Sequence, residues 1–330
     1  MPLPTQSDLH VNVPLTNVSV AYMQKAGDYI ASKVFPKVPV TKQSDLYWKY
    51  SKSDWRRTEV KRRAPATESP GVGWSQTTDN YYCHPYAVHK DIDDQVRANS
   101  DSNFKLDKES TEFITNQLLL KRDLDWNATY FKSGVWDVDL VGGTDFTKFD
   151  DAASDPISFM AQRIIQFRKR NGFKPNKLVL GANVMVGLKN HPDIIDRIKY
   201  TQRGIVTEDL IATLFDIDDI YTSYATLSDG PQIPDAQLQD AAATYDFITD
   251  PNGMLMLYAP ASPSLQTPSA GYTFTWDGYV NSGGNGIRIK RFRQEQIESD
   301  RVEGSMTYDM KVVSPDCGEY FSDVVAAIAD

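Results

Sequence analysis

Two stretches rich in aromatic residues, 45–63 and 74–92, constrain the fold of this chain more than any other feature. They read DLYWKYSKSDWRRTEVKRR and WSQTTDNYYCHPYAVHKDI, and aromatic and β-branched residues at this density are typical of strands. The ten residues between them, APATESPGVG, are rich in Pro and Gly and favour a turn. We therefore expect one long antiparallel hairpin over residues 45–92, with arms that reach roughly 50–60 Å at about 3.3 Å per residue.

A ribbon of this length has a packing problem. A two-stranded hairpin alone is marginally stable in water, and strands of globular proteins are usually about 3–10 residues long. A compact fold would have difficulty covering all the rings on these arms with its own core, and large amphipathic rings are favoured at interfaces. We therefore expect part of the ribbon to lie on another copy of the chain. The alternative is two ordinary strands in a local sheet.

The tryptophans and arginines of the ribbon are its candidate contact residues. They are Trp48, Trp55, Arg56, Arg57, Arg62, Arg63 and Trp74. Residues 46–63 hold seven Lys or Arg against Asp54 and Glu59, in a chain whose formal net charge is −9. This positive charge fits a nucleic-acid patch, an acidic surface on a neighbouring copy, or a merely solvated face. We favour the acidic surface, because residues 137–155 carry six Asp against one Lys.

The chain begins with an arm and continues to a long helix. Residues 1–20 are polar and interrupted by Pro, which favours an extended arm, and residues 21–34 have the spacing of a short helix. A long helix is predicted over residues 107–133, which contain no Pro or Gly, with Asp107 as its N-cap. Its apolar stripe is predicted from Phe113, Leu120, Leu124 and Phe131, with Ile114 and Leu118 beside them.

Residues 155–224 alternate between helical and strand patterns, which predicts an α/β domain around a central sheet. Asp155 and Pro156 open a helix that Gly172 ends, and KLVL at residues 177–180 is a short buried strand. Short helices at 183–189 and 207–215, a strand at 220–224 and a surface loop at 236–244 complete the pattern. The last third of the chain reads as strands over residues 253–258, 271–276, 286–292 and 302–313.

Few residues could carry chemistry. Cys83 and His84 are neighbours on a predicted strand, so they point to opposite faces and cannot both join His89 in a tetrahedral metal site. The acidic residues at 91, 93 and 94 could serve a metal-dependent phosphoester enzyme, but the sequence has no glycine-rich phosphate loop and no nucleophile motif. We expect no metal site, no cofactor and no enzymatic activity.

The chain shows no pattern of export or membrane insertion. Its first residues lack the basic and apolar regions of a secretory signal, and no apolar run approaches the roughly 20 residues of a membrane helix. Its two cysteines, Cys83 and Cys317, are far apart in the sequence, so we expect buried thiols in a reducing cytoplasm.

The order of these elements resembles that of the major capsid proteins of tailed bacteriophages with the Hong Kong 97-type fold. Several strings are similar to segments of one siphophage branch: FPKVPV at 35–40, RAPATESP at 63–70, YAVHKDIDD at 86–94, LVLG at 178–181 and KNHPDI at 189–194. The resemblance spans about residues 20–325, and it depends on architecture and these strings together.

The resemblance implies an α+β fold of five parts. They are an N-terminal arm over residues 1–44, a long β-hairpin called the E-loop over 45–92, a peripheral domain over 93–154 with a spine helix at 107–133, an α/β axial domain over 155–270, and strands over 271–330 that return to the peripheral domain.

The resemblance also implies a structural role. Hexamers and pentamers of one chain would assemble in the host cytoplasm into the icosahedral head of a virion, which encloses double-stranded DNA without reading its sequence. A separate scaffolding protein, a portal and a decoration protein are the implied partners, and a membrane is not. An encapsulin-like compartment is the alternative within this fold, and a metal-dependent phosphoester enzyme is the alternative outside it.

Overall fold

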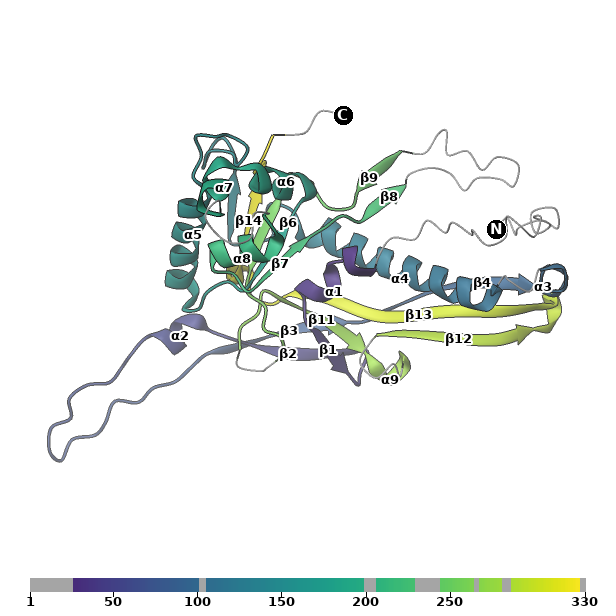
Figure 1. The fold of residues 1–330 in the computed structure, drawn as a ribbon. Helices are drawn as coiled ribbons and strands as arrows, with labels where there is room; N and C mark the ends of the chain where they lie inside the picture. The colour runs from purple at the N-terminus through teal and green to yellow at the C-terminus, as the bar shows by residue number, and fades with distance from the viewer. Residues whose placement is uncertain are drawn as a thin grey trace.

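The computed structural model describes residues 26–100, 105–198, 206–228, 244–263, 267–280 and 286–326. The strands of these residues form two five-stranded sheets and two two-stranded ribbons. Figure 1 shows an elongated molecule, with one sheet inside a helical body on the left and the other extending to the right beneath a long helix. This mixture of helix and sheet agrees with the α+β class that the sequence predicts.

The first sheet is organised around its longest strand, β13 (Ser299–Val312). β4 (His84–Asp93) and β12 (Ile287–Gln294) both pair antiparallel with residues 299–306 of β13, so they lie along its two edges. β11 (Gly271–Trp276) pairs with residues 309–312 of β13, and β1 (Lys37–Val40) joins β11 in parallel.

The long helix α4 (Leu106–Tyr130) packs on this sheet, within a few residues of its predicted bounds. The predicted stripe is confirmed at Ile114, Leu118 and Phe131, which are buried. It is wrong at Phe113, which is 48 % exposed, and it missed the buried Trp126 and Tyr130. The buried positions recur every four residues, and the charged residue at position 122 occupies the stripe and obscures its pattern. The predicted N-cap is also wrong, since Lys105 precedes the helix and caps it with no side chain.

The second sheet has the order β5-β14-β10-β6-β7. Its strands are Val138–Val141, Gly318–Ser322, Met254–Leu257, Lys177–Leu180 and Asp219–Thr222 in that order. Side chains alternate along each strand, so β6 and β10 bury one set of residues against helices and the other set against the end of α4. The predicted strands at 177–180 and 220–224 are therefore found, and β14 is a strand that the sequence reading missed.

Helices α5 (Pro156–Asn171), α6 (Ala182–Asn190), α7 (Pro192–Ile198) and α8 (Glu208–Phe215) belong to the body around this second sheet (Figure 1). The Asp155 side chain accepts a hydrogen bond from the Ser158 amide, and Pro156 is the first helical residue, as predicted. Gly172 ends α5 with a φ of 89°, which glycine adopts without strain.

The remaining elements are short. They are η2 (Ala26–Asp28), α1 (Ala31–Val34), β2 (Ser44–Tyr50), α2 (Lys52–Arg56), β3 (Gln76–Tyr82), α3 (Asp94–Asn99), β8 (Thr226–Ser228), β9 (Tyr245–Phe247), α9 (Asp277–Val280), η3 (Glu295–Ile297) and η4 (Pro315–Cys317). The helix predicted over 21–34 is thus two shorter turns where the chain is described. The arm at 1–20 and most of the loop predicted at 236–244 lie outside the described residues.

The predicted hairpin over residues 45–92 is real but shorter than expected. β2 and β3 pair antiparallel over seven residues each, and α2 replaces the predicted strand directly after Ser51. The second arm breaks at Cys83, whose amide donates to the Gln43 carbonyl, and the chain then pairs with β13 as β4. Half of the predicted ribbon is therefore anchored in its own subunit.

Candidate interaction surface

The β2–β3 ribbon has one face on the body and one face in solvent. On the body side, the ring centroids of Tyr47 and Tyr81 lie 5.3 and 4.6 Å from that of Phe274 on β11. Alternate residues of β2 point the other way, and there Leu46 and Trp48 are 62 % and 53 % exposed. The subunit itself therefore covers one ring-bearing face of the ribbon and leaves the other face exposed.

The exposed rings continue from β2 onto α2 and the returning strand. The centroid of Trp55 lies 6.4 Å from Tyr50 and 6.2 Å from Trp74. Both tryptophans remain at least 60 % exposed, although they contact each other. The base of the loop is closed by the Asp54 carboxylate, which accepts hydrogen bonds from the amide and the hydroxyl of Ser75 at 2.8 and 2.6 Å. Together, Leu46, Trp48, Tyr50, Trp55, Trp74 and Tyr82 form what we call the aromatic face.

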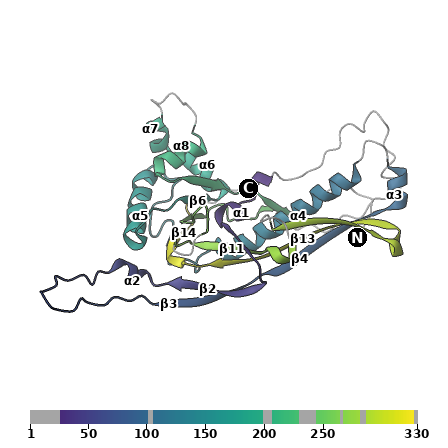
Figure 2. The same ribbon diagram turned by 90° about the horizontal axis from the view of Figure 1, so that it is seen from below.

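Beyond α2 the chain runs out of the body as an open loop, residues 57–74. Figure 2 shows it extending in the direction opposite to the β12–β13 end of the first sheet. Arg62 and Arg63 are exposed, and the hydrogen bond of Arg63 goes to the Thr67 carbonyl within the same loop. Val60 is 88 % exposed at a position with no core beneath it. The loop therefore presents positive charge and apolar side chains away from the body of the subunit.

The seven predicted contact residues divide into two groups. All seven are exposed, and the bonds of Arg56 to another part of the fold distinguish it from Trp48, Trp55, Arg57, Arg62, Arg63 and Trp74. Arg57 is also 3.5 Å from Asp54 of the same helix. Arg56 differs from the others, because its guanidinium donates to two backbone carbonyls at the end of α5 in the same chain.

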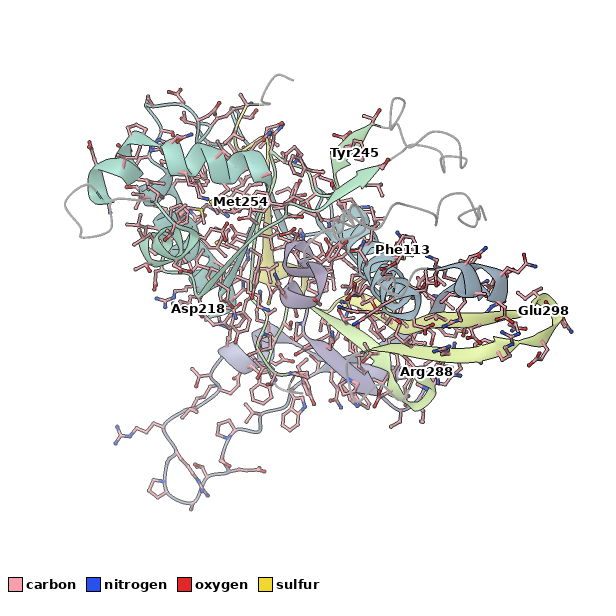
Figure 3. All side chains as sticks on the ribbon, turned by 45° about the vertical axis from the view of Figure 1, so that its right-hand side comes forward. Phe113, Asp218, Tyr245, Met254, Arg288 and Glu298 are labelled. Atoms are coloured by element: carbon pink, nitrogen blue, oxygen red, sulfur yellow. The ribbon has the colours of Figure 1, made fainter. Side chains whose placement is uncertain are left out.

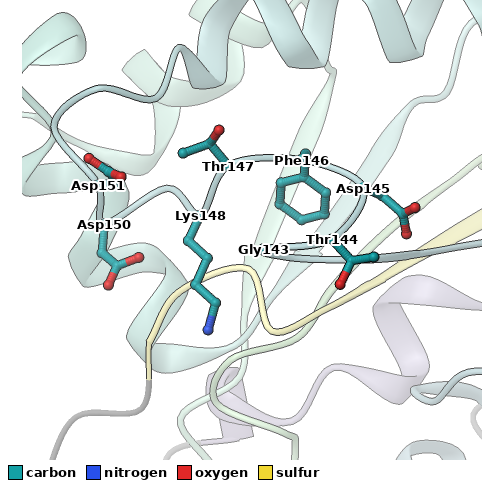
Figure 4. A pocket seen from close by; sticks show the side chains of 8 residues that line it. All are labelled: Gly143, Thr144, Asp145, Phe146, Thr147, Lys148, Asp150 and Asp151. Carbon is teal, nitrogen blue, oxygen red and sulfur yellow. The ribbon is translucent and has the colours of Figure 1, made fainter.

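The acidic stretch at 137–155 contains β5 and then a loop around a hollow of about 610 Å³, lined by residues 143–148, 150 and 151. Figure 4 shows Asp145, Asp150 and Asp151 on this loop together with Lys148. Each of the three carboxylates accepts one backbone hydrogen bond, from Val141, Ala326 and Ala153 respectively. These bonds fix the loop, and each uses only one of the two carboxylate oxygens, so the side chains can still accept from a cationic partner.

Sequence reading missed a second group of exposed rings, on the β8–β9 ribbon. Tyr245 and Phe247 are alternate residues of β9 and share a face, with 56 % and 41 % of their surface exposed. Figure 3 shows Tyr245 on a ribbon that stands away from the second sheet. The pattern YDF was the only available signal, and three residues are too few for a strand to be predicted.

Two of the three acidic residues at 91, 93 and 94 pair with arginines from the first sheet. Asp91 accepts two hydrogen bonds from Arg301 at 2.7 and 2.8 Å, and Asp94 accepts two from Arg293 at 2.6 and 2.5 Å. These bonds hold the pKa of both carboxyls below the usual range. The Asp93 carboxylate caps α3 by accepting from the Gln95 amide. All three side chains therefore have structural partners, which leaves the phosphoester-enzyme alternative without its proposed ligands.

The second proposed chemical cluster is also separated. Cys83 is buried, and burial raises the pKa of its thiol to about 12, whereas His84 is exposed. Burial likewise raises the pKa of the Cys317 thiol to about 12. Within the described residues, no three His, Cys, Asp or Glu side chains are grouped so that they could hold a metal ion. The same residues include no helix long and apolar enough to span a membrane.

Two curated relatives are similar to this chain in sequence. The major capsid protein of Burkholderia phage BcepMu is 27 % identical over 224 residues, which are 66 % of this chain and 70 % of the relative. The major capsid protein of Pseudomonas phage JBD67 is 27 % identical over 226 residues, with the same coverage. The chain matches no protein-family model.

Solved structures are similar over nearly the whole chain. A phage-related protein from Bordetella bronchiseptica RB50 has a TM-score of 0.66 at 19 % identity and covers 91 % of this chain and 93 % of its own. The capsid protein of cyanophage P-SCSP1u has a TM-score of 0.62 at 13 % identity, covering 96 % and 93 %. The SrpI encapsulin of Synechococcus elongatus PCC 7942 has a TM-score of 0.53 at 8 % identity, covering 96 % of each chain.

Proposed function

We infer that this chain, whose fold is that of the Hong Kong 97-type capsid proteins, is the major capsid protein of a bacteriophage. The observation that carries this inference is the aromatic face, which its own subunit leaves uncovered on a ribbon already anchored by its other side. Two phage relatives with that name support it over two thirds of the chain. The fold supports it over nearly all of the chain.

The parts of the subunit follow from this role. Residues 45–92 act as the E-loop, whose second arm ends in β4 of the first sheet. α4 acts as the spine helix, and the first sheet is the core of the peripheral domain. The second sheet with α5–α8 is the axial domain, to which β14 also belongs. Residues 1–44 act as the N-terminal arm, whose described part, from residue 26 onward, includes α1 and β1. In each hexamer and pentamer, the E-loop of one subunit lies over the next, and the arm contacts a further copy.

Coverage of the aromatic face supplies the energy of this contact. Burying a large apolar side chain contributes about 1.5–3 kcal/mol, so the six side chains of this face are worth roughly 10 kcal/mol before the cost of ordering the loop is subtracted. Every subunit of a closed shell would make the same contact, and each single interaction can remain moderate. The chain's net charge of −9 is compatible with DNA enclosed without sequence-specific binding.

The positive charge of the loop gives the contact its orientation. We assign the acidic loop around residues 143–151 of a neighbouring copy as the surface that receives Arg62 and Arg63. The basic loop of one copy and the acidic loop of the next attract each other, whereas two basic loops or two acidic loops repel. The charges therefore favour a head-to-tail arrangement of the copies. Such a heterologous contact closes into rings, as hexamers and pentamers require.

We also propose where the shell is assembled and which proteins accompany it. The shell is assembled in the host cytoplasm, with a separate scaffolding protein, a portal and a decoration protein as partners, and it becomes part of the virion. It has a structural role without catalysis or a cofactor. An encapsulin-like compartment has the same fold, but the encapsulin similarity is structural at 8 % identity, whereas the sequence relatives are phage proteins.

The test is the protein content of particles from the host that carries the gene. Particles should be separated by density and imaged by electron microscopy, and their proteins should be quantified by mass spectrometry. We expect this chain to be the most abundant protein of DNA-filled icosahedral heads. Its absence from such heads would contradict the inference, and shells filled with an enzyme instead of DNA would favour the encapsulin alternative.

A further inference from the structure

The base of the E-loop is fastened to the axial domain of its own subunit. Helix α2, which precedes residues 57–74, lies beside the C-terminal end of α5 (Figure 1), and its Lys52 also contacts the short helix η4. These elements are more than 110 residues apart in the sequence, so the contact joins two separate parts of the fold. Two cationic side chains of α2, Lys52 and Arg56, make the bonds.

Arg56 binds the exposed end of α5. Its Nη1 donates to the Arg170 carbonyl at 2.5 Å, and its Nη2 donates to the Lys169 carbonyl at 3.1 Å. The last carbonyls of a helix have no partner within the helix and carry partial negative charge, which makes a cation favourable there. A Cβ on Gly172 would lie 3.6 Å from the Arg56 guanidinium carbon, an ordinary van der Waals contact, so Arg56 lies directly beside the residue that ends α5.

Lys52 makes the second attachment. Its ammonium donates to the Asp316 carboxylate of η4 and lies 3.5 Å from the Asn171 side-chain oxygen. The site that receives it is rigid, because the Asp316 carbonyl accepts hydrogen bonds from both Arg170 and Asn171 at 3.1 and 2.7 Å. Arg170 in turn pairs at 2.8 Å with Glu319, whose side chain is fully buried.

We propose that Lys52 and Arg56 form a latch that sets the direction in which the E-loop leaves the subunit. The latch fixes α2 on the axial domain, so that only the aromatic face and residues 57–74 are left to meet a neighbour. Lys52 and Arg56 are positioning residues, since their bonds lie within one chain. This separates Arg56 from the other predicted contact residues, which point into solvent.

A distance measured in the unassembled subunit tests the latch directly. Nitroxide labels are attached at Ser53→Cys on α2 and Ile165→Cys on α5, two exposed positions that make none of the latch bonds. The native Cys83 and Cys317 do not compete for the label, because both are buried and burial raises the pKa of each thiol to about 12. Pulsed electron spin resonance then gives the distribution of distances between α2 and α5.

We expect one narrow distance in the labelled parent and at least a twofold broader distribution when Lys52→Met and Arg56→Met are combined. The matched control, Lys108→Met with Lys132→Met, removes two charges from exposed positions on and beside α4, outside the proposed contact, and should stay narrow. Lys52→Arg keeps the charge and should also stay narrow when introduced alone. Each single Met variant is measured as well, so that one misfolded protein does not decide the result. A double latch variant as narrow as its control would overturn the proposal.

The consequence for the shell is measured separately and depends on the proposed function. If the latch sets the angle of the loop, particles from the Lys52→Met and Arg56→Met variant should vary in diameter, whereas those of the control should be uniform. Uniform particles from the latch variant would contradict this consequence. Failure of the parent protein to form particles would contradict the proposed function and leave the distance measurement valid on its own.

Discussion

Asp123 and Lys177 hold opposite ends of the same helical turn. The Asp123 carboxylate of α4 accepts hydrogen bonds from the amides of Ile30 and Ala31 at 2.9 and 2.7 Å, at the start of α1. The Lys177 ammonium of β6 donates to the carbonyls of Lys33 and Val34 at 2.6 and 3.1 Å, at its end. Each charge matches the partial charge of the helix end that it touches. The turn therefore joins α4 to β6 of the second sheet.

Removal of the Asp123 carboxylate should make the first residues of α1 open more often. In Asp123→Ala the two buried amides lose their partner, which costs about 1–3 kcal/mol, whereas Asp123→Asn retains an oxygen that can accept both bonds. We expect amide hydrogen exchange at Ile30 and Ala31 to become at least tenfold faster in the Ala variant and to change little in the Asn variant. Equal exchange in all three proteins would show that the carboxylate does not hold the turn.

The same residue predicts a pH dependence of stability. Burial raises the pKa of Asp123 to about 6, so the folded chain binds a proton more tightly than the unfolded chain, whose Asp pKa is about 3.9. The contribution is therefore fully present below about pH 4 and is lost as the pH rises through about 6, to a total of about 3 kcal/mol. The free energy of unfolding of the parent, measured against Asp123→Asn, should fall by up to this amount between pH 4 and 7.

Other carboxyls have lowered pKa values, so their contribution to stability has the opposite pH dependence. The effect of Asp123 is therefore measured as the difference in unfolding free energy between the parent and Asp123→Asn. Arg301 lowers the pKa of Asp91 and Arg97 lowers that of Asp107, so their contributions are lost on acidification. They are present in both proteins and cancel in the difference. A difference between the parent and Asp123→Asn that is constant across the pH range would contradict the assignment.

Gly304 is required where α4 lies closest to the first sheet. A Cβ at this position would be 2.3 Å from a methyl carbon of Ile114 and 2.9 Å from one of Leu118. Gly304→Ala should therefore destabilise the subunit by about 1–3 kcal/mol through overpacking, as a lower melting temperature would show. Gly71→Ala is the matched control, because a Cβ there has no neighbour within 4 Å. Ile114→Ala, which removes the crowded methyl carbon, should therefore cost less stability in the Gly304→Ala background than in the parent.

How far the sequence predicts this fold depends on the range of the interactions. Local signals located α5 with its Asp155 cap and most of α4, because capping and helical period involve neighbouring residues. The path of β4 was missed, because its partner β13 lies more than 200 residues away and the sequence continues smoothly through Cys83. The aromatic face could be predicted from composition, but Tyr81 is buried and Tyr82 is not, and only the sheet beneath them decides this.

The partners of the charged residues also could not be predicted, because they lie far away in the sequence. A cluster of acidic residues is equally consistent with a metal site and with ion pairs, and the arginines that neutralise Asp91 and Asp94 come from strands about 200 residues later. Likewise, Arg56 and Arg57 are adjacent in the sequence, yet only Arg56 reaches the carbonyls at the end of α5. Its role depends on the position of a helix that starts 100 residues further along the chain.

The aromatic face should be needed for assembly and dispensable for folding. Trp55→Ala with Trp74→Ala removes two rings that contact each other and no core residue, so the melting temperature of the subunit should change little. Particle formation, measured by light scattering and electron microscopy, should fall at least tenfold. Phe113→Ala, at an exposed ring on α4, is the control for loss of surface area. Normal particles from the double variant would remove the aromatic face from the proposed contact.

The charge match between the loop and the acidic hollow can be tested by reversal and rescue. Arg62→Glu with Arg63→Glu should stop assembly, because two carboxylates would then face the Asp-rich loop of the neighbour. Asp150→Lys with Asp151→Lys should do the same from the other side. Mixing the two assembly-defective proteins does not restore every contact, but combining all four changes in one chain reverses both partners everywhere and should restore particles. If the combined variant stays as defective as its parents while its subunit remains folded, these two surfaces do not meet.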